Sequence, residues 1–296
     1  MRFVVTGGSG FIGNRLVRGL LAQGLRVQVL DESMSGLADI CSPLLGLHCG
    51  SVLDSYLISS LVKESDVLIH LAAFSSLNRC KEDPIHSRRV NVEGTKLIGD
   101  IVNRFRKLVI FTSSAAVYGS NPPPHSENMD VNPLSLYAEQ KVEAEEHLIE
   151  SGSSLILRLF NVYGPSCPGN NSNEGVISKF LKGALENTPV SVSGDGGQLR
   201  DFVYIDEVVR ALILGSRFAG TSSVFNVGTG VNSSVNELVR LISRVTGRNV
   251  ETRGCQGKGD EVRISLAETT KASNVLGFTS TVPLVDGLAR TYRALQ

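Results

Sequence analysis

The segment TGGSGFIG (residues 6–13) connects an apolar run, RFVVT (2–6), to a stretch with apolar residues at helical spacing (11–23). Glycines in such a strand–turn–helix connection permit a tight turn and let amides at the helix N-terminus approach a diphosphate. Asp31 ends the next apolar run, about 20 residues on, where a carboxylate can hold ribose hydroxyls. The segment therefore predicts a dinucleotide site; the alternatives are an ordinary glycine-rich turn and a capping carboxylate.

Asp31 also bears on which dinucleotide binds. Its charge repels a 2′-phosphate, and no Arg or Lys occurs between Glu32 and Leu37 to offset that repulsion. We therefore predict NAD rather than NADP.

Apolar runs alternate with helix-like stretches through the first half of the chain. Helical patterns lie near 55–64, 84–104 and 134–150, between the runs 2–6, 26–30, 66–71, 107–112 and 154–159. This alternation implies right-handed crossovers and a parallel sheet with helices on both faces. We predict an α/β protein whose doubly wound parallel sheet occupies residues 1–163.

The pattern changes after residue 163, where a Gly- and Asn-rich loop leads into shorter, mixed elements. RDFVYI (200–205) and the helix-like segment after it resemble one more strand and helix, so 201–217 is expected to return to the first domain. The segments 164–200 and 218–296 then predict a smaller mixed α/β lobe for the substrate.

Composition excludes several classes of partner. Lys+Arg and Asp+Glu both number 29, so no basic excess favours nucleic acid or an anionic membrane surface. The five cysteines are odd in number and form no CxxC pair, which favours reduced thiols in a cytoplasm over disulfides or zinc. The five histidines show no ligand spacing, and no apolar run has the length of a membrane span. We assign no metal and no membrane contact.

YAEQK (137–141) places a tyrosine and a lysine four residues apart, on one face of a helix. A free tyrosine, with a pKa of roughly 10, is a poor base at neutral pH. A nearby ammonium, together with a positively charged nicotinamide, would favour the phenolate and make Tyr137 a general base. Lys141 could also hold the nicotinamide ribose. Taken alone, the pair is better explained as incidental on a surface helix.

Eight motifs in order resemble the extended short-chain dehydrogenase/reductase family, within its nucleotide-sugar epimerase and dehydratase branch. The pattern is most similar to UDP-glucose and UDP-N-acetylglucosamine 4-epimerases. The motifs are TGGSGFIG, HLAA (70–73), NVEGT (91–95), SSAAVYG (113–119), YAEQK, RLFNVYGP (158–165), GDGGQLRDFVYIDEV (194–208) and NVGTG (226–230). The resemblance spans essentially the whole chain and implies a Rossmann-type domain that binds NAD.

The resemblance implies a role for each matching residue. Ser114 would bond the same substrate hydroxyl as Tyr137, with Lys141 completing the catalytic group. Arg200 and Asn161 would hold the diphosphate of a nucleotide sugar, a task that suits the arginine fork. The residues implied to bind the cofactor are Gly7, Gly10, Phe11, Ile12, Gly13, Asp31, Ser51, Val52, Leu71, Ala72, Ala73, Asn91, Ser113, Tyr137 and Lys141. The residues implied to bind the substrate are Ser114, Tyr137, Asn161, Arg200, Lys258, Glu261, Arg263 and Ser265.

Two positions depart from the family pattern near the cofactor. Ser51 stands where a carboxylate normally contacts the adenine amino group, which puts adenine affinity in question. Gln140 stands where a serine often precedes the active-site lysine.

A third departure lies in residues 255–272. An ungapped match puts Lys258 and Glu261 at the positions of a family Arg and acid, and Ser265 at a gate beside the sugar's 2-substituent. An alternative alignment of this segment would place Gly257 at the position of the family Arg and Ile264 at the gate. A small gate residue leaves room for an N-acetyl group.

The SSAAVYG motif also separates possible reactions. A 4,6-dehydratase needs an extra acid and base after the catalytic hydroxyl, and a decarboxylase relative keeps one acid there. Ala115 and Ala116 provide neither. We therefore predict a UDP-sugar 4-epimerase acting through a transient 4-keto sugar, on UDP-glucose and UDP-galactose and also on UDP-N-acetylhexosamines.

Two alternatives to the epimerase are kept. The first is a dehydratase or decarboxylase on the same scaffold. The second is a non-catalytic nucleotide-binding member, although such chains tend to lose the Tyr–Lys pair. The resemblance also implies a homodimer through the helices near 84–104 and 134–150.

Overall fold

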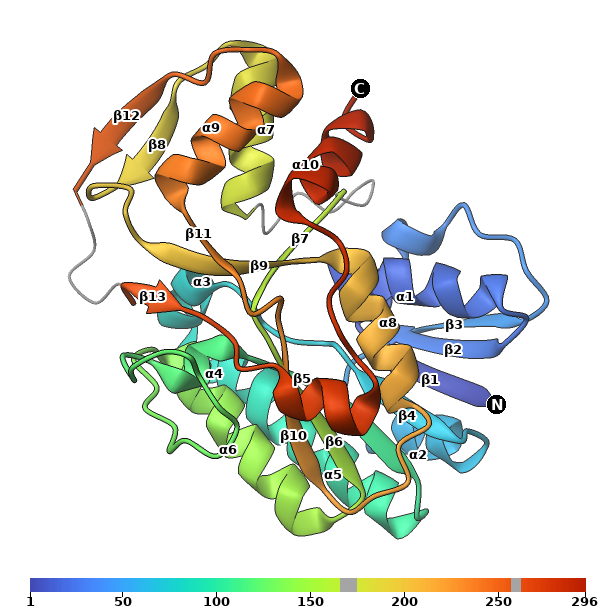
Figure 1. The fold of residues 1–296 in the computed structure, drawn as a ribbon. Helices are drawn as coiled ribbons and strands as arrows, with labels where there is room; N and C mark the ends of the chain where they lie inside the picture. The colour runs from blue at the N-terminus through green and yellow to red at the C-terminus, as the bar shows by residue number, and fades with distance from the viewer. Residues whose placement is uncertain (166–174, 257–261) are drawn as a thin grey trace.

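A seven-stranded parallel sheet, in the order β3-β2-β1-β4-β5-β6-β10, forms the centre of the protein (Figure 1). The computed structural model describes residues 1–165, 175–256 and 262–296. Every residue of β4 and β6 is buried, as expected for strands covered on both faces. The strands are β1 (Arg2–Thr6), β2 (Arg26–Asp31), β3 (Leu45–Cys49), β4 (Val67–His70), β5 (Leu108–Ser114), β6 (Ser154–Leu159) and β10 (Ser223–Val227).

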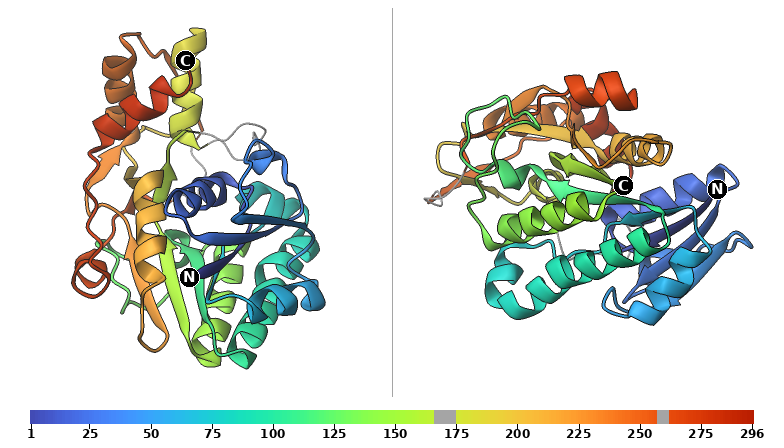
Figure 2. Two further views of the ribbon diagram at one scale, coloured as in Figure 1. Left: turned by 90° about the vertical axis from the view of Figure 1, so that its right-hand side faces the viewer. Right: turned by 90° about the horizontal axis from the view of Figure 1, so that it is seen from below.

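Helices cover both faces of this sheet, and alternate strand residues pack against them. On β5, Ile110 faces the cluster that includes α1 and α8, whereas Val109 and Phe111 face the cluster that includes α2, α5 and α6. The view from below shows α5 and α6 side by side (Figure 2, right). The elements here are α1 (Phe11–Ala22), η1 (Ser35–Leu37), α2 (Ser55–Lys63), α3 (Leu77–Glu82), α4 (Pro84–Arg88), η2 (Arg89–Glu93), α5 (Gly94–Arg104), η3 (Ala115–Tyr118), α6 (Leu136–Ser151), α8 (Ile205–Gly215) and η4 (Ala272–Leu276).

A smaller lobe lies at the top of Figure 1 and has its own core, which includes Phe180, Phe202 and Leu238. Its four-stranded sheet runs β11-β9-β13, with β7 also paired to β9, and a separate two-stranded sheet joins β8 to β12. The elements are β7 (Asn161–Tyr163), α7 (Val176–Glu186), β8 (Val190–Ser193), β9 (Leu199–Tyr204), β11 (Asn232–Ser234), α9 (Val235–Thr246), β12 (Thr252–Cys255), β13 (Ile264–Ser265) and α10 (Leu284–Arg293).

The predicted α/β class with a doubly wound parallel sheet is confirmed, but the chain crosses between lobes more often than the predicted boundaries allow. Helix α8 packs on α1, within the expected return of 201–217, whereas β9 belongs to the smaller sheet. Conversely, β10 lies in the segment 218–296 yet pairs with β6 in the central sheet. Hydrogen bonding to a distant strand decides this placement, and local pattern does not reveal the partner.

The order of the strands reverses between β1 and β4, so the crossovers leave in opposite directions there. In open parallel sheets this is where the carboxyl ends of the strands leave a crevice for ligands. Within the described part of the chain, no helix combines the length and apolar character needed to cross a membrane.

Candidate active site

A cavity of about 1160 Å³ opens at the carboxyl ends of the central strands and reaches the smaller lobe. Its wall combines the glycine loop, the segment 71–79 after β4, the end of β5, helix α6 and strand β7. The structure thus brings together, around one cavity, most residues that the sequence predicted for the site. These are Gly7, Gly10, Phe11, Ile12, Gly13, Asp31, Val52, Leu71, Ala72, Ala73, Ser113, Ser114, Tyr137, Lys141 and Asn161.

Backbone atoms pack closely against the glycine loop at two positions, Gly7 and Gly13. Gly7 has φ +72°, and a Cβ there would lie 2.5 Å from the Ala72 amide nitrogen. A Cβ at Gly13 would collide with the Gly7 carbonyl oxygen. Helix α1 then begins with Gly10 as its N-cap, and no side chain caps this end of the helix, where a diphosphate can bind. Only glycine fits this cradle.

Two buried hydroxyls on the cavity wall have no hydrogen-bond partner among the described residues. They are Ser9 Oγ in the glycine loop and Ser113 Oγ at the end of β5. Buried polar atoms are normally satisfied, so both groups point to a polar ligand. The closely packed glycine loop, the start of α1 without a side-chain cap and these hydroxyls fit a dinucleotide, with its diphosphate at the start of α1.

Asp31 links the glycine loop to the turn after β2. Its Oδ2 accepts the Ser9 amide at 2.9 Å and its Oδ1 accepts the Ser33 amide at 3.0 Å. The carboxylate is therefore a turn acceptor and also part of the cavity wall, so the two interpretations of this residue are compatible. The cofactor-side prediction for Ser51 fits less well. Gly50 and Val52 line the cavity, while Ser51 Oγ accepts the Leu53 amide at 3.4 Å.

Helix α6 carries Tyr137 and Lys141 to the end of β5, where Ser114 lies. Ser135 caps the helix by accepting the Ala138 amide at 3.2 Å. Lys141 is 2 % exposed, and its Nζ donates to the Thr112 carbonyl at 2.9 Å. This ammonium lies 4.4 Å from the centre of the Phe111 ring and 5.8 Å from that of the Tyr137 ring.

Burial governs the ionisation of both groups in the free protein. It raises the pKa of Tyr137 well above its usual value of 10, and hydrogen bonding with Ser114 opposes this only in part. Burial also lowers the pKa of Lys141 to about 8, while the charge of Glu145 acts in the opposite direction. The sequence predicted a phenolate favoured by the lysine together with a positively charged nicotinamide. In the protein alone, desolvation outweighs the neighbours of Tyr137 and keeps its pKa high.

A buried ion pair lies one helical turn beyond Lys141. Glu145 accepts hydrogen bonds from Arg158 Nε and Nη2, and the two side chains are 4 % and 6 % exposed. The Arg158 guanidinium lies 4.9 Å from the centre of the Tyr118 ring. Sequence analysis missed this pair, although Glu145 follows Lys141 at the i+4 spacing.

Asn91 lies behind the cavity wall, 2 % exposed. Its Oδ1 accepts the Phe74 amide at 2.7 Å and its Nδ2 donates to the Phe74 carbonyl at 3.1 Å. The resemblance implied a place for Asn91 in the cofactor site; in the structure its side chain holds the backbone of Phe74, which lines the cavity. The wall also contains Phe74, Arg79 and His86, which sequence analysis did not single out.

The substrate-side predictions gather on adjacent strands of the smaller sheet. Arg200 on β9 is paired with Ser265 on β13, and Asn161 on β7 is paired with Phe202 on β9. Asn161 Nδ2 donates to the Asp201 carbonyl at 3.2 Å. Lys258 and Glu261 lie outside the described residues.

Two arginines near this sheet contact the protein itself. Arg263 forms a two-pronged ion pair with Asp195, at 2.7 and 2.8 Å. Arg200 Nη1 donates to the Leu199 carbonyl at 3.0 Å. The carboxylate of Asp201, next to Arg200 in sequence, accepts hydrogen bonds from the backbone amides of Thr229, Gly230 and Ala267. Neither arginine, nor Ser265, is part of the described cavity wall.

Comparisons with known proteins agree with this geometry. The UDP-glucose 4-epimerase of Mycolicibacterium smegmatis is 36 % identical over 306 residues, covering 98 % of this chain and 97 % of that protein. A UDP-N-acetyl-alpha-D-glucosaminuronate decarboxylase of Bacillus cytotoxicus is 32 % identical over 262 residues, covering 83 % and 80 %. The crystal structure of Thermotoga maritima UDP-glucose 4-epimerase with UDP-glucose superimposes with a TM-score of 0.92 at 30 % identity, covering 100 % and 98 %.

Residues 3–228 match the model of the NAD dependent epimerase/dehydratase family. The predictions of NAD as cofactor and of the wider family resemblance are thereby confirmed. With the glycine cradle, the Tyr–Lys pair and a relative 36 % identical over nearly its whole length, this chain belongs to the NAD-dependent epimerase/dehydratase family.

Proposed function

We propose that this protein is a UDP-sugar 4-epimerase that acts through a transient 4-keto sugar. The glycine loop and Asp31 would hold NAD, which would supply reversible hydride transfer at sugar C4. Tyr137 takes the proton of the O4 hydroxyl and later gives it back, while the Ser114 hydroxyl hydrogen-bonds the same oxygen. Lys141, held by the Thr112 carbonyl, keeps a positive charge beside Tyr137 and binds the nicotinamide ribose.

The observation that carries this proposal is the scarcity of acids on the described cavity wall. Its carboxylates are Asp31 and Glu32, both at the end of β2 and so on the side assigned to the adenine ribose. After Ser114 the chain continues as Ala115 and Ala116 in a 3-10 turn. Dehydration needs a further acid and base beside the sugar, and this part of the wall supplies no carboxylate for either role.

The diphosphate and sugar are assigned to the smaller lobe. We place the diphosphate near Asn161 and Arg200 on adjacent strands, with Arg263 released from Asp195 to reach it. Lys258 and Glu261 complete this group in the proposal. Ser265, paired with Arg200, is the small residue proposed to leave room for an N-acetyl group, so both plain and N-acetylated hexoses are proposed substrates.

We further propose a cytoplasmic homodimer. Helices α4 and α6 carry exposed isoleucines, with Ile85 76 % and Ile149 43 % exposed, and this supports pairing through these helices. The cysteines of the described residues are all free thiols, in keeping with a reducing compartment.

A panel of UDP-, dTDP- and GDP-sugars, followed by chromatography and mass measurement, tests the function. The expected result is interconversion of a gluco/galacto pair of UDP-sugars with no change in mass. Loss of water or of carbon dioxide would instead identify a dehydratase or a decarboxylase. Protein that holds NAD but converts none of the sugars would contradict the proposal.

A further inference from the structure

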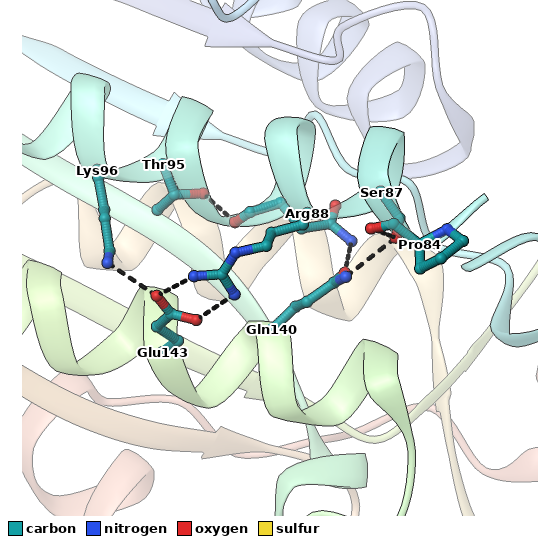
Figure 3. A network of polar contacts seen from close by, with 8 residues as sticks. Pro84, Ser87, Arg88, Thr95, Lys96, Gln140 and Glu143 are labelled. Carbon is teal, nitrogen blue, oxygen red and sulfur yellow. Dashed lines mark hydrogen bonds and ion pairs between the residues drawn. The ribbon is translucent and has the colours of Figure 1, made fainter. Parts of the chain in front are cut away.

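The side-chain amide of Gln140 is hydrogen-bonded inside the protein through both its nitrogen and its oxygen. Gln140 lies on α6 next to Lys141 and is 1 % exposed. Its Nε2 donates to Ser87 Oγ at 3.0 Å, and the Ser87 hydroxyl donates to the Pro84 carbonyl at 3.1 Å (Figure 3). Because the single proton of Ser87 is already committed, its oxygen can only accept from Gln140. The orientation of the amide is therefore fixed.

This orientation turns Gln140 Oε1 toward Asn91, whose Nδ2 donates to it at 2.7 Å. Asn91 must then present its Oδ1 to the Phe74 amide. A reversed Asn91 would set an NH₂ group against the Phe74 N–H and a carbonyl against the Phe74 C=O. Gln140 and the Phe74 backbone therefore favour the same orientation of Asn91, and Gln140 adds to its stability.

Phe74 connects this chain of contacts to the site. It belongs to the segment 71–79, every residue of which lines the cavity. Its carbonyl also accepts a hydrogen bond from the Cys80 thiol, and its ring contacts both the Arg79 guanidinium and, edge to face, the His86 ring. The Gln140–Asn91–Phe74 contacts thus join one wall of the cavity to the helix that carries Tyr137 and Lys141.

A second set of contacts joins the same helices without touching the cavity. Glu143, one turn away from Gln140, pairs with Arg88 at 2.6 Å and with Lys96 at 2.8 Å (Figure 3). These groups are 31 % to 51 % exposed, and such pairs contribute little to stability. Glu143 therefore contacts the helices next to α6, whereas Gln140 contacts Asn91, so the two roles can be tested separately.

We propose that Gln140 is a positioning residue: its amide orients Asn91 and so holds the 71–79 wall in place relative to Tyr137 and Lys141. The serine that the resemblance implies at this position lacks the amide that bonds Ser87 and Asn91, so the arrangement depends on glutamine. Its effect on turnover rests on the proposed epimerase function. Its effects on backbone exchange and NAD affinity do not.

The test compares Gln140→Met, which keeps the shape and removes both hydrogen bonds, with Gln140→Glu, which keeps an acceptor for Asn91. Glu143→Gln is the matched control on the same helix. Hydrogen exchange of segment 71–79, NAD affinity by calorimetry, and kcat and KM with UDP-glucose are measured for each. Loss of a hydrogen bond corresponds to roughly 5- to 10-fold faster exchange. A displaced wall can lower kcat by up to about 100-fold.

The expected result for Gln140→Met is faster exchange in 71–79, weaker NAD binding and a lower kcat with little change in KM. Gln140→Glu should recover most of the exchange protection, and Glu143→Gln should match the unaltered protein. Wild-type exchange and NAD affinity in Gln140→Met would overturn the proposal, as would equal effects in Glu143→Gln. If Gln140→Met does not fold, Ser87→Ala, which removes the anchor of the amide, must still loosen 71–79.

Inactivity of the unaltered protein on every sugar would count against the proposed function alone. Exchange and NAD affinity would then still decide the role of Gln140.

Discussion

Replacing Glu145 by glutamine tests how the protein maintains the charge of its buried lysine. Glu145 and Arg158 are 4 % and 6 % exposed and share three hydrogen bonds of 2.7 to 3.2 Å. Removing one partner of a buried pair leaves an uncompensated charge and costs about 3–5 kcal/mol. At about 2–4 °C per kcal/mol for a chain of this size, Tm should fall by roughly 6–20 °C.

The same change acts on Lys141, one turn earlier on α6. Burial lowers the pKa of Lys141 to about 8, and the negative charge of Glu145 raises it. Glu145→Gln removes that support, so the pKa should fall further. Because the ammonium is lost as the pH rises through this pKa, the alkaline limb of the pH–activity profile should begin at a lower pH in the variant.

Calorimetric unfolding and pH profiles of kcat/KM measure the two effects. The double variant Glu145→Leu/Arg158→Met is the informative control, because replacing both charges by apolar groups is often neutral or stabilising. It should unfold at a higher temperature than Glu145→Gln. A double variant less stable than the single one, or an alkaline limb that does not move in Glu145→Gln, would refute the reasoning.

Three further predictions concern single side chains. Tyr137→Phe should lower kcat by roughly 100-fold or more while NAD and the nucleotide sugar still bind, as seen by comparing turnover with calorimetry. Asp31→Asn should weaken NAD binding by about 10- to 100-fold, because a charged acceptor for the ribose is lost; an unchanged dissociation constant would show that Asp31 serves only the turn. Burial lowers the pKa of His70 from 6.5 to about 3, so below pH 6.5 only the unfolded chain gains a proton at this residue. The free energy of unfolding should therefore fall as the pH drops below 6.5. In chemical denaturation between pH 6.5 and 5, His70→Asn should lower that slope by up to about 1.4 kcal/mol per pH unit.

The central strands and helices could be predicted because their signals are local. Four of the six residues of β6 are apolar, and the glycines at 7, 10 and 13 belong to one turn. The partner of β10 could not be predicted, since Ser223–Val227 would suit either sheet and its pairing with β6 joins residues about 70 apart. Strand β13 of the smaller sheet poses the same problem. It has only two residues, and it forms a strand only through its pairing with β9.

Individual site residues were easier to predict than their interactions. Motif order placed Ser114, Tyr137 and Lys141 at one site, and the structure puts all three on the cavity wall. The role of Gln140 depends on Ser87, 53 residues away, and on Asn91, 49 residues away. Arg263 shows the same limit, because its ion pair with Asp195 joins two turns 68 residues apart.

The electrostatics of the Tyr–Lys pair depend on burial, which spacing does not encode. Burial disfavours the charged form of each group, so it raises the pKa of Tyr137 and lowers that of Lys141. A positive charge placed beside the pair would favour the phenolate but would also disfavour the ammonium. Lys141 therefore needs a compensating negative charge away from Tyr137, and Glu145 lies one turn along the helix on that side. The i+4 spacing thus joins Tyr137, Lys141 and Glu145 electrostatically: in the proposed mechanism the carboxylate favours the charged lysine while Tyr137 gives up its proton.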